Sequence, residues 1–446
     1  MARILHLFLP LLCCLAAARG SVDFRADLNH PYAGSSLSTA HVIGHAARAS
    51  KARAARINAR LARALGQGGA ISAAHVPLAP LGDEGHSLTV GIGTPPQPRT
   101  LIVDTGSDLI WTQCELSRGR TARQREPPLY DPRKSSSFSF LPCGSRLCQE
   151  GQFSFKNCTG NRCMYDELYG SAEADGALAS ETFTFGVQRS KGKVSLPLGF
   201  GCGALSAGSL VGASGLMGLS PGTMSLISQL SVPRFSYCLI PFAERKTSPM
   251  LFGAMADLRK YNTTGPIQTT SILRNPAMDT FYYYVPLVGL SLGTKRLGVP
   301  AASLAIQPDG SGGTIVDSGS TIAYLAGTAF EAVKRAVLEE VRLPVFNGTV
   351  EDYELCFALP SGVPMAAVKT PQLVLHFDGG AAMALPRDNY FQEPRAGLMC
   401  LAVDRSPEDL GAPISIIGNV QQQNMHVLFD VRNQKLAFAP TKCHDI

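Results

Sequence analysis

The sequence LIVDTGSDLIW at residues 101–111 recurs later in the chain as TIVDSGSTIAYL at residues 314–325. Each copy is a short apolar run that leads into Asp-Thr/Ser-Gly-Ser. A second element recurs in the same order: GLMGL at residues 215–219 and SIIGN at residues 415–419 place two apolar residues and a glycine after each Asp loop. Two copies of one pattern predict two related lobes that could face each other across a cleft.

The repeated loops carry one carboxylate each, Asp104 and Asp317. In both loops an apolar strand buries the base, a glycine allows a tight turn, and a small hydroxyl residue can hydrogen-bond the loop. These supporting residues are Thr105, Gly106, Ser318 and Gly319. If the loops meet, two carboxylates lie side by side and hold one proton between them, because like charges that close cannot both ionise. Such a pair suits peptide hydrolysis: the ionised Asp takes a proton from a water while the protonated Asp polarises the carbonyl.

Beyond residue 85, short apolar runs alternate with Gly and Pro, which indicates a mostly β architecture. Examples are residues 88–92, 101–103, 182–185, 282–288, 373–377 and 427–431. The clearest helical pattern in this part is TAFEAVKRAVLEEV at residues 328–341.

The amino-terminal segment differs from the rest in composition. Arg3 followed by an apolar run to Ala18 is typical of a secretory signal peptide, with an uncleaved anchor as the alternative. Residues 46–65 are Ala- and Arg-rich, which predicts a basic helix, and GQGG at residues 66–69 begins a linker. We therefore expect a signal peptide at 1–20, a basic pro-segment at 21–80, an amino-terminal lobe at 81–265 and a carboxy-terminal lobe at 266–446.

The positive charge also sits in that segment. The chain has 40 basic residues (Lys and Arg) and 34 acidic residues (Asp and Glu). Residues 1–75 contain nine of the basic and two of the acidic residues, which leaves 31 basic and 32 acidic residues in 76–446. A body with a net charge of −1 gives no reason to expect nucleic-acid binding. No segment after the leader is apolar enough to predict a membrane anchor, and we expect a monomer whose partners are polypeptide substrates and its own pro-segment.

Twelve cysteines are present, of which two, at positions 13 and 14, fall in the leader. The other ten are an even number in an oxidising compartment, which predicts five disulfides. Zinc-type CxxC pairs are absent, so we expect no metal and no cofactor. Three glycosylation sequons stand at Asn157, Asn262 and Asn347, of which Asn157 is the weakest because Cys158 adjoins it.

Together these motifs resemble the pepsin-like aspartic proteases, and within them the nepenthesin-type plant branch. The resemblance runs from about residue 85 to the end. It rests on the two Asp loops and on FGCG (200–203), FSYCL (235–239), GGTIVDSGS (312–320), SIIGNVQQQN (415–424) and FAP (438–440). FRADLNH (24–30) and the Arg-rich helix resemble that branch's pro-segment. Dyads of such proteases are the standard example of a shared proton.

The resemblance implies a bilobal fold with the active site between the lobes and roles for particular residues. Asp104 and Asp317 correspond to the catalytic pair, and Ser107 and Ser320 to the residues that hydrogen-bond the outer carboxylate oxygens. Tyr169 matches the tyrosine of the hairpin flap that closes over substrate, and Trp111 the indole that hydrogen-bonds that tyrosine. From the residues alone, Trp111 could equally be core and Tyr169 an ordinary strand tyrosine.

The resemblance also implies a set of disulfides. They are Cys143–Cys163, Cys148–Cys158, Cys238–Cys443 and Cys356–Cys400, with Cys114 and Cys202 left over to pair with each other. The chain departs from its relatives in two places. Residues 115–128 lack the usual cysteine cluster, and the flap reads YGSAEADG (169–176), one residue shorter than usual. Ala172 replaces the tip glycine, so the nearest turn former is Asp175-Gly176. We expect the tip to absorb the deletion, which leaves Tyr169 facing the cleft.

The sequence thus predicts a secreted aspartic endopeptidase, made as a zymogen and active at acid pH, in the extracellular space or cell wall, with the vacuole as an alternative. A different class stays open: some secreted plant proteins of this fold act as inhibitors of wall-degrading enzymes. Those proteins typically have damaged Asp loops or lack the flap tyrosine, whereas both loops and Tyr169 are present here.

Overall fold

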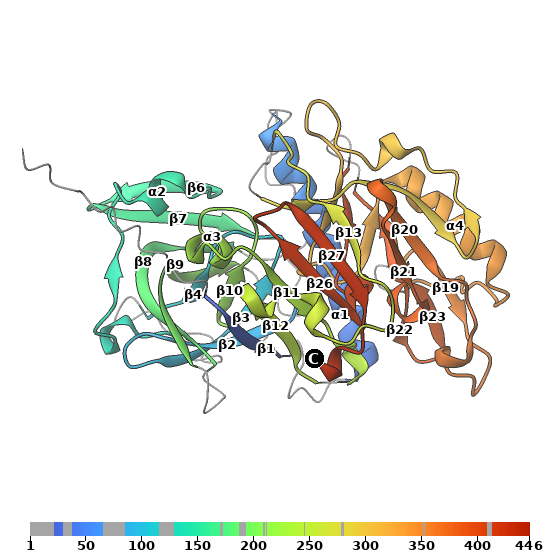
Figure 1. Ribbon diagram of the computed structural model, residues 1–446, viewed down its shortest axis with the longest axis horizontal. Helices are drawn as coiled ribbons and strands as arrows, with labels where there is room; N and C mark the ends of the chain where they lie inside the picture. Colours follow the sequence, from blue (N-terminus) through green and yellow to red (C-terminus); the bar gives the residue numbers. More distant parts are fainter. Residues whose placement is uncertain are drawn as a thin grey trace, which may run out of the picture.

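The computed structural model describes residues 22–29, 38–65, 85–115, 129–169, 173–186, 193–207, 210, 212–244, 246–277, 281–350, 353–407 and 413–446. The described part is mostly β and forms two lobes with a long helix between them (Figure 1). The predicted bilobal β architecture is confirmed. The signal peptide expected at residues 1–20 and the linker that begins at residue 66 lie outside the described residues.

One sheet joins the two halves of the chain. Its strands run in the order β1 (Phe24–Leu28), β12 (Ser248–Phe252), β11 (Phe235–Cys238), β26 (Met425–Asp430), β27 (Lys435–Pro440) and β13 (Gln268–Ser271). Strand β1 comes from the expected pro-segment and pairs antiparallel with β12. Phe24 lies opposite Phe252, and their rings stack with centroids 4.2 Å apart. Alternate residues of β1 are buried, so this strand is packed as part of the body.

The amino-terminal lobe is built on a long sheet. Its order is β2 (Ser87–Ile92), β3 (Gln97–Asp104), β10 (Gly215–Gly218), β4 (Trp111–Gln113), β9 (Val194–Ala207), β8 (Glu173–Phe185), β7 (Arg162–Leu168) and β6 (Phe155–Thr159), with β5 (Ser139–Phe140) on β8. Two short helices accompany it, α2 (Arg146–Glu150) and α3 (Leu226–Leu230).

The carboxy-terminal lobe contains smaller sheets. One has the order β14 (Tyr283–Tyr284), β17 (Thr314–Val316), β25 (Ser415–Ile417), β18 (Ala323–Leu325) and β24 (Val403–Arg405). A second sheet has the order β16 (Lys295–Arg296), β15 (Leu287–Leu292), β20 (Leu373–Phe377) and β21 (Ala382–Leu385). A third has the order β19 (Cys356–Ala358), β23 (Leu398–Leu401) and β22 (Phe391–Arg395). Helix α4 (Gly327–Glu340) covers this lobe and matches the helical pattern expected at residues 328–341.

Helix α1 (Thr39–Ala64) runs through the space between the lobes (Figure 1). It starts seven residues before the predicted helix, because Ser38 caps it: the Ser38 hydroxyl accepts a hydrogen bond from the backbone N–H of His41. A stripe of apolar residues at helical spacing packs on aromatic and aliphatic side chains of the carboxy-terminal lobe. These residues are Ile43, Ala47, Ala54, Ile57 and Leu61.

Candidate active site

The two Asp loops are built in the same way. Strand β3 ends at Asp104 and pairs in parallel with β10, and the backbone N–H of Leu219 donates to the Asp104 carbonyl at 2.8 Å. Strand β17 pairs in parallel with β25, and the N–H of Asp317 donates to the Ile417 carbonyl at 3.1 Å. The apolar-apolar-Gly elements that repeat in the sequence are therefore the strands that support the Asp loops.

The loops lock onto each other through their hydroxyl residues. The Thr105 N–H donates to the Ser318 hydroxyl at 3.2 Å, and the Ser318 N–H donates to the Thr105 hydroxyl at 2.8 Å. Each loop thus holds the other in register at the base of the cleft. All four groups are buried, so these bonds are shielded from water and fix the carboxylates that adjoin them.

Glycine is required where the loops approach. A Cβ on Gly106 would lie 2.6 Å from an Asp317 oxygen, and a Cβ on Gly319 would lie 2.5 Å from an Asp104 oxygen. Each glycine therefore makes room for the carboxylate of the opposite loop. The glycine N–H groups also bind the carboxylates of their own loops, at 2.9 Å for Asp104 and 3.0 Å for Asp317.

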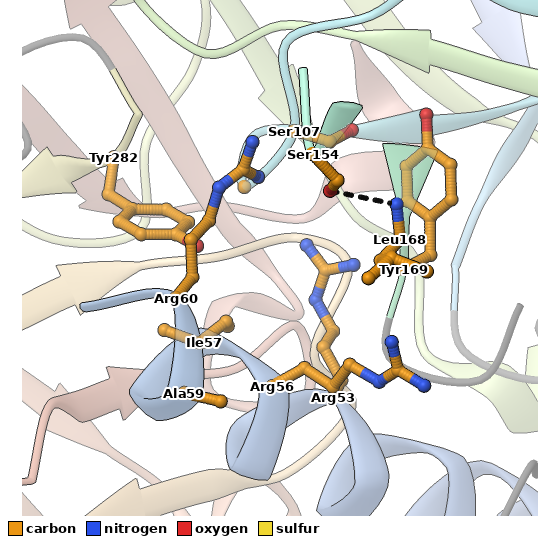
Figure 2. Close-up of a pocket in the computed structure, with 11 residues that line it drawn as sticks. Arg53, Arg56, Ile57, Ala59, Arg60, Ser107, Ser154, Leu168, Tyr169 and Tyr282 are labelled. Carbon is orange, nitrogen blue, oxygen red and sulfur yellow. Dashed lines mark hydrogen bonds between the residues drawn. The ribbon is translucent and has the colours of Figure 1, made fainter. Parts of the chain in front are cut away.

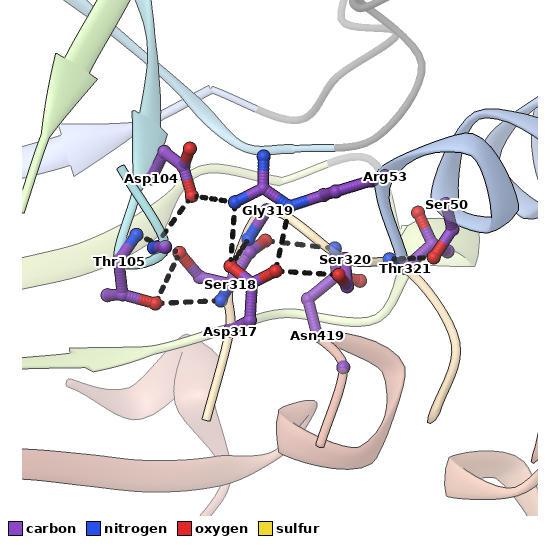
Figure 3. Close-up of polar contacts among 12 residues, drawn as sticks. Ser50, Arg53, Asp104, Thr105, Asp317, Ser318, Gly319, Ser320, Thr321 and Asn419 are labelled. Carbon is purple, nitrogen blue, oxygen red and sulfur yellow. Dashed lines mark hydrogen bonds and ion pairs between the residues drawn. The ribbon is translucent and has the colours of Figure 1, made fainter. Parts of the chain in front are cut away.

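Arg53 of α1 lies between the two carboxylates (Figure 3). Its Nη2 donates to Asp104 Oδ1 at 2.6 Å and to Asp317 Oδ1 at 3.0 Å, and its Nε donates to Asp317 Oδ2 at 2.7 Å. All three side chains are buried, with exposed fractions of 6%, 1% and 0%. A guanidinium presents its donors in a planar fork, which suits it to bridge two carboxylates. The sequence predicts the basic helix but does not show which arginine reaches the dyad.

The two carboxylates are held unequally. Asp317 also accepts a hydrogen bond from the Ser320 hydroxyl at 2.6 Å, as the resemblance implies. Ser107 makes no matching bond of ordinary geometry: its hydroxyl and Asp104 Oδ2 are both buried without a hydrogen-bond partner among the described residues. Ser107 therefore does not form the expected bond with ordinary geometry, although it lies close enough to lower the pKa of Asp104.

The pKa values of the pair move apart accordingly. Burial raises the pKa of Asp104, the nearby Asp317 adds to that rise, and Arg53 only partly offsets it. For Asp317, burial also favours the neutral form, but the charge and hydrogen bonds of Arg53, with those of Ser320 and Gly319, outweigh it and lower the pKa. With α1 in place, Asp104 therefore takes up a proton more readily than Asp317 does.

Further polar contacts hold α1 in the cleft. The Ser50 hydroxyl accepts from the Thr321 N–H at 3.0 Å, just after the Asp317 loop. Asn58 is buried; its amide donates to Ser406 and its oxygen accepts from the Ile414 N–H at 2.7 Å. At the amino-lobe side, Arg60 pairs with Glu167 at 3.0 Å. The helix is thus fastened at the dyad and on both lobes.

Tyr169 and Trp111 are neighbours but not in the way that the resemblance implies. Their rings stack with centroids 5.9 Å apart and planes 29° apart. Trp111 Nε1 and the Tyr169 hydroxyl are both buried without a hydrogen-bond partner among the described residues, so the expected hydrogen bond between them is absent. Tyr169 lines the pocket beside α1 (Figure 2).

The flap hairpin is formed by β7 and β8. Its last described pair is Leu168 with Glu173, and Asp175 and Gly176 pair with β7 residues deeper in the ladder. The expectation that Asp175-Gly176 is the nearest turn is therefore wrong, because both residues lie within β8, where they pair with β9 as well. The tip expected to absorb the deletion includes residues 170–172, which lie outside the described residues.

The disulfides match the expected pairs except in one cluster. The structure joins Cys114–Cys202, Cys238–Cys443 and Cys356–Cys400. In place of Cys143–Cys163 and Cys148–Cys158, it joins Cys143–Cys158 and Cys148–Cys163. Burial explains the exchange: Cys148 and Cys163 both point into the core of the amino-terminal lobe, whereas Cys158 on β6 is exposed and pairs with the half-buried Cys143.

Asn157, Asn262 and Asn347, the three sequon asparagines, are exposed. Among the residues that the structure describes, no helix has the length and apolar character of a membrane span. Across those same residues, no three His, Cys, Asp or Glu side chains gather in a way that could hold a metal ion.

Two family models match the chain. They are described as "Xylanase inhibitor N-terminal" over residues 86–254 and "Xylanase inhibitor C-terminal" over residues 282–440. Among curated proteins, aspartic proteinase nepenthesin-1 of Nepenthes gracilis is 40% identical over 81% of this chain and 79% of its own length. Nepenthesin-2 of the same plant is 36% identical over 95% of this chain and 91% of its own. Aspartyl protease 37 of Oryza sativa subsp. japonica is 34% identical over 83% of this chain and 82% of its own length.

Solved structures agree on the fold. The crystal structure of edgp superposes with a TM-score of 0.63 over 81% of this chain and 92% of that one, at 17% identity. The crystal structure of basic 7S globulin from soybean superposes with a TM-score of 0.62 over 81% of this chain and 94% of that one, at 16% identity. At such identities the likeness concerns the fold alone. The family models and the relatives, taken with the paired Asp loops, show that this chain belongs to the plant pepsin-like aspartic protease family.

Proposed function

We propose that this protein is a secreted aspartic endopeptidase made as a zymogen, in which Asp104 and Asp317 activate a water and helix α1 blocks them. One observation carries the proposal: a single buried guanidinium, Arg53, bridges two buried carboxylates from the two repeated loops at 2.6–3.0 Å. Burying two carboxylates side by side costs free energy unless a cation pairs with them. Buried ionisable groups of this kind are found chiefly at functional sites.

With α1 removed, the two carboxylates lose their shared cation and can hold one proton between them. The ionised carboxylate then takes a proton from a water that attacks the scissile carbonyl. The protonated one donates to the carbonyl oxygen and stabilises the tetrahedral intermediate. The Gly106 and Gly319 N–H groups and the Ser320 hydroxyl keep the carboxylates oriented during these steps. Neither a covalent intermediate nor a metal is required.

With α1 in place, the same site is blocked twice. Arg53 occupies the position between the carboxylates where the water and the carbonyl would lie, and it neutralises the negative charge that the base needs. The apolar stripe of α1 also fills the cleft beside the dyad. We therefore assign residues 38–65 to an inhibitory segment, continuous with the strand β1 that is inserted into the central sheet.

Acid should favour release. Arg53 lowers the pKa of Asp317 in the blocked form, so this pairing stabilises docking above the ordinary pKa of an Asp and is lost as the pH falls through the lowered pKa. Arg53 lowers the pKa of Asp104 as well, but burial and the charge of Asp317 outweigh it, and the pKa of Asp104 stays raised. Asp317 is thus the member of the dyad that makes release acid-dependent. Cleavage within residues 66–84 would then separate α1 from the enzyme.

The same proposal covers location and partners. The leader at residues 1–20 and the disulfides fit an oxidising compartment, outside the cell or in the wall, with the vacuole as an alternative. The exposed sequons suit N-glycosylation there. Polypeptides and the chain's own pro-segment are the expected partners of a monomeric enzyme without a membrane anchor.

Hydrolysis of a denatured protein tests the proposal. The purified full chain is held at acid pH and then assayed with and without a statine-type transition-state analogue. We expect hydrolysis to appear after acid treatment and to stop with the analogue. Protein that cleaves nothing under any of these conditions would contradict the proposal and would favour a role as an inhibitor or binding protein of other secreted enzymes.

A further inference from the structure

Arg60 of α1 occupies a second acidic pocket, separate from the dyad. Its Nη2 pairs with Glu167 Oε1 at 3.0 Å, and its Cζ lies 4.0 Å from the centre of the Phe281 ring. A carboxylate at one end and an aromatic face beside it are the two groups that proteins use to hold a cation. The burial of Glu167, 3% exposed on β7, makes this more than a surface ion pair.

The pocket is prepared independently of Arg60. The second oxygen of Glu167 accepts from the Ser154 N–H at 2.8 Å and from the Ser154 hydroxyl at 3.3 Å, so the carboxylate stays oriented without α1. Asp108 lies behind it, buried, and the pKa of Asp108 is raised to about 7 by burial and by the negative charge of Glu167, against the effect of Arg60. Loss of Arg60 therefore leaves two buried acidic groups, which either take up a proton or pair with another cation.

The pocket also opens onto the dyad. One cavity beside α1 is lined by Ser107, which follows the Asp104 loop, and by Ser154 and Leu168 (Figure 2). Ser154 binds Glu167 and Leu168 adjoins it in the chain, so the cavity links the two sites. Arg53 and Arg60 are seven residues apart, which places them on one face of the helix and about 10 Å apart along its axis. An extended peptide spans that distance with about three residues.

We propose that in the mature enzyme this pocket binds a basic side chain of the substrate, an arginine or lysine about three residues from the scissile bond, with Glu167 as the specificity-determining residue. The inference rests on the proposed function and deepens it: α1 blocks the cleft by placing one arginine on the dyad and a second where a substrate cation binds. Glu167 acts in binding and touches none of the reacting atoms.

Peptide pairs that differ in a single charge test the pocket on the unmodified enzyme. The full chain is acid-activated and given peptides in which arginine, or its neutral isostere citrulline, stands at each position one to four residues from the scissile bond. We expect kcat/KM to be about 10-fold higher or more for arginine at one position two to four residues away, because the neutral urea of citrulline cannot make the charge-assisted hydrogen bond of a guanidinium to Glu167.

Two variants then assign the preference. Glu167→Gln should reduce the arginine-to-citrulline ratio to near one. Asp166→Asn removes a carboxylate from the next residue of β7, on the opposite face of the strand, and should leave the ratio as it is. Because the ratio compares two substrates of the same variant, partial misfolding of Glu167→Gln would lower both rates and not the ratio.

The outcomes separate the two proposals. Activated protein that cleaves none of the peptides contradicts the peptidase function itself. Activated protein that cleaves them without an arginine preference at any of these positions contradicts the pocket alone. A preference that persists in Glu167→Gln shows that Glu167 is not its source and also overturns the inference.

Discussion

The Asp104 and Asp317 loops share one sequence pattern and one backbone arrangement, yet α1 donates different numbers of hydrogen bonds to their carboxylates. Asp317 receives two hydrogen bonds from Arg53 and one from Ser320, whereas Asp104 receives one from Arg53, and its second oxygen has no hydrogen-bond partner among the described residues. The difference shows that a duplicated site need not be blocked symmetrically. One carboxylate holds the inhibitor in its ionised form, and the other is left nearer to the neutral state.

Removing either carboxylate should cost activity equally, whatever its hydrogen bonds in the blocked form. Asp104→Asn and Asp317→Asn each keep the side-chain shape but remove the proton exchange, so we expect rates about 100- to 10,000-fold lower for the activated protein. Hydrolysis of a denatured protein measures this, and Asp378→Asn, an exposed position, is the control. A dyad variant that retains a large share of the activity would contradict the mechanism.

Removing the bridging cation should have the next largest effect. Arg53→Met leaves two buried carboxylates without their partner, which typically costs about 3–5 kcal/mol of docking free energy. We expect conversion to the active form to be at least 100-fold faster near neutral pH. The rate is measured from the appearance of the shortened chain on a gel. Lys51→Met removes one positive charge from an exposed position of the same helix and should accelerate conversion far less than Arg53→Met does.

The pH dependence of docking should distinguish the two carboxylates. In Asp104→Asn, which cannot process itself, Asp317 remains, and hydrogen exchange in α1 should still accelerate as the pH falls. In Asp317→Asn that acceleration should be much weaker, because the carboxyl whose pKa is lowered in the blocked form is gone. Equal pH dependence in the two variants would show that the asymmetry of the blocked site does not control release.

The two serines offer the smallest contrast. Ser320→Ala removes a 2.6 Å hydrogen bond to Asp317, and we expect kcat/KM to fall by about 10-fold. Ser107→Ala removes a hydroxyl without a partner of ordinary geometry, so its effect should be several-fold smaller. Steady-state kinetics of the activated variants measure both. A larger loss in Ser107→Ala would mean that Ser107 turns to Asp104 once α1 leaves.

The parts of the site that follow from local pattern could be predicted from the sequence. The repeated apolar strand, Asp, small hydroxyl residue and glycine are short-range features, and the structure places both copies together. What the sequence did not indicate depends on distant packing. Several arginines lie on α1, and only the angle at which the helix crosses the cleft selects Arg53 for the dyad and Arg60 for Glu167.

The errors have the same origin. The cysteines at 143, 148, 158 and 163 lie in two neighbouring segments, so spacing permits both pairings, and burial of Cys148 with Cys163 selects one. Trp111 and Tyr169 are close, as expected, but their relative orientation depends on packing, which the sequence does not show, and their rings stack without a hydrogen bond.

Binding of a statine-type inhibitor to the full chain tests the central claim, that α1 and its Arg53 occupy the dyad. Isothermal titration at neutral pH should show no binding before the segment at residues 66–84 is cut. After acid activation it should show one inhibitor bound per protein. Stoichiometric binding to the uncut chain at neutral pH, with α1 still docked, would contradict the account.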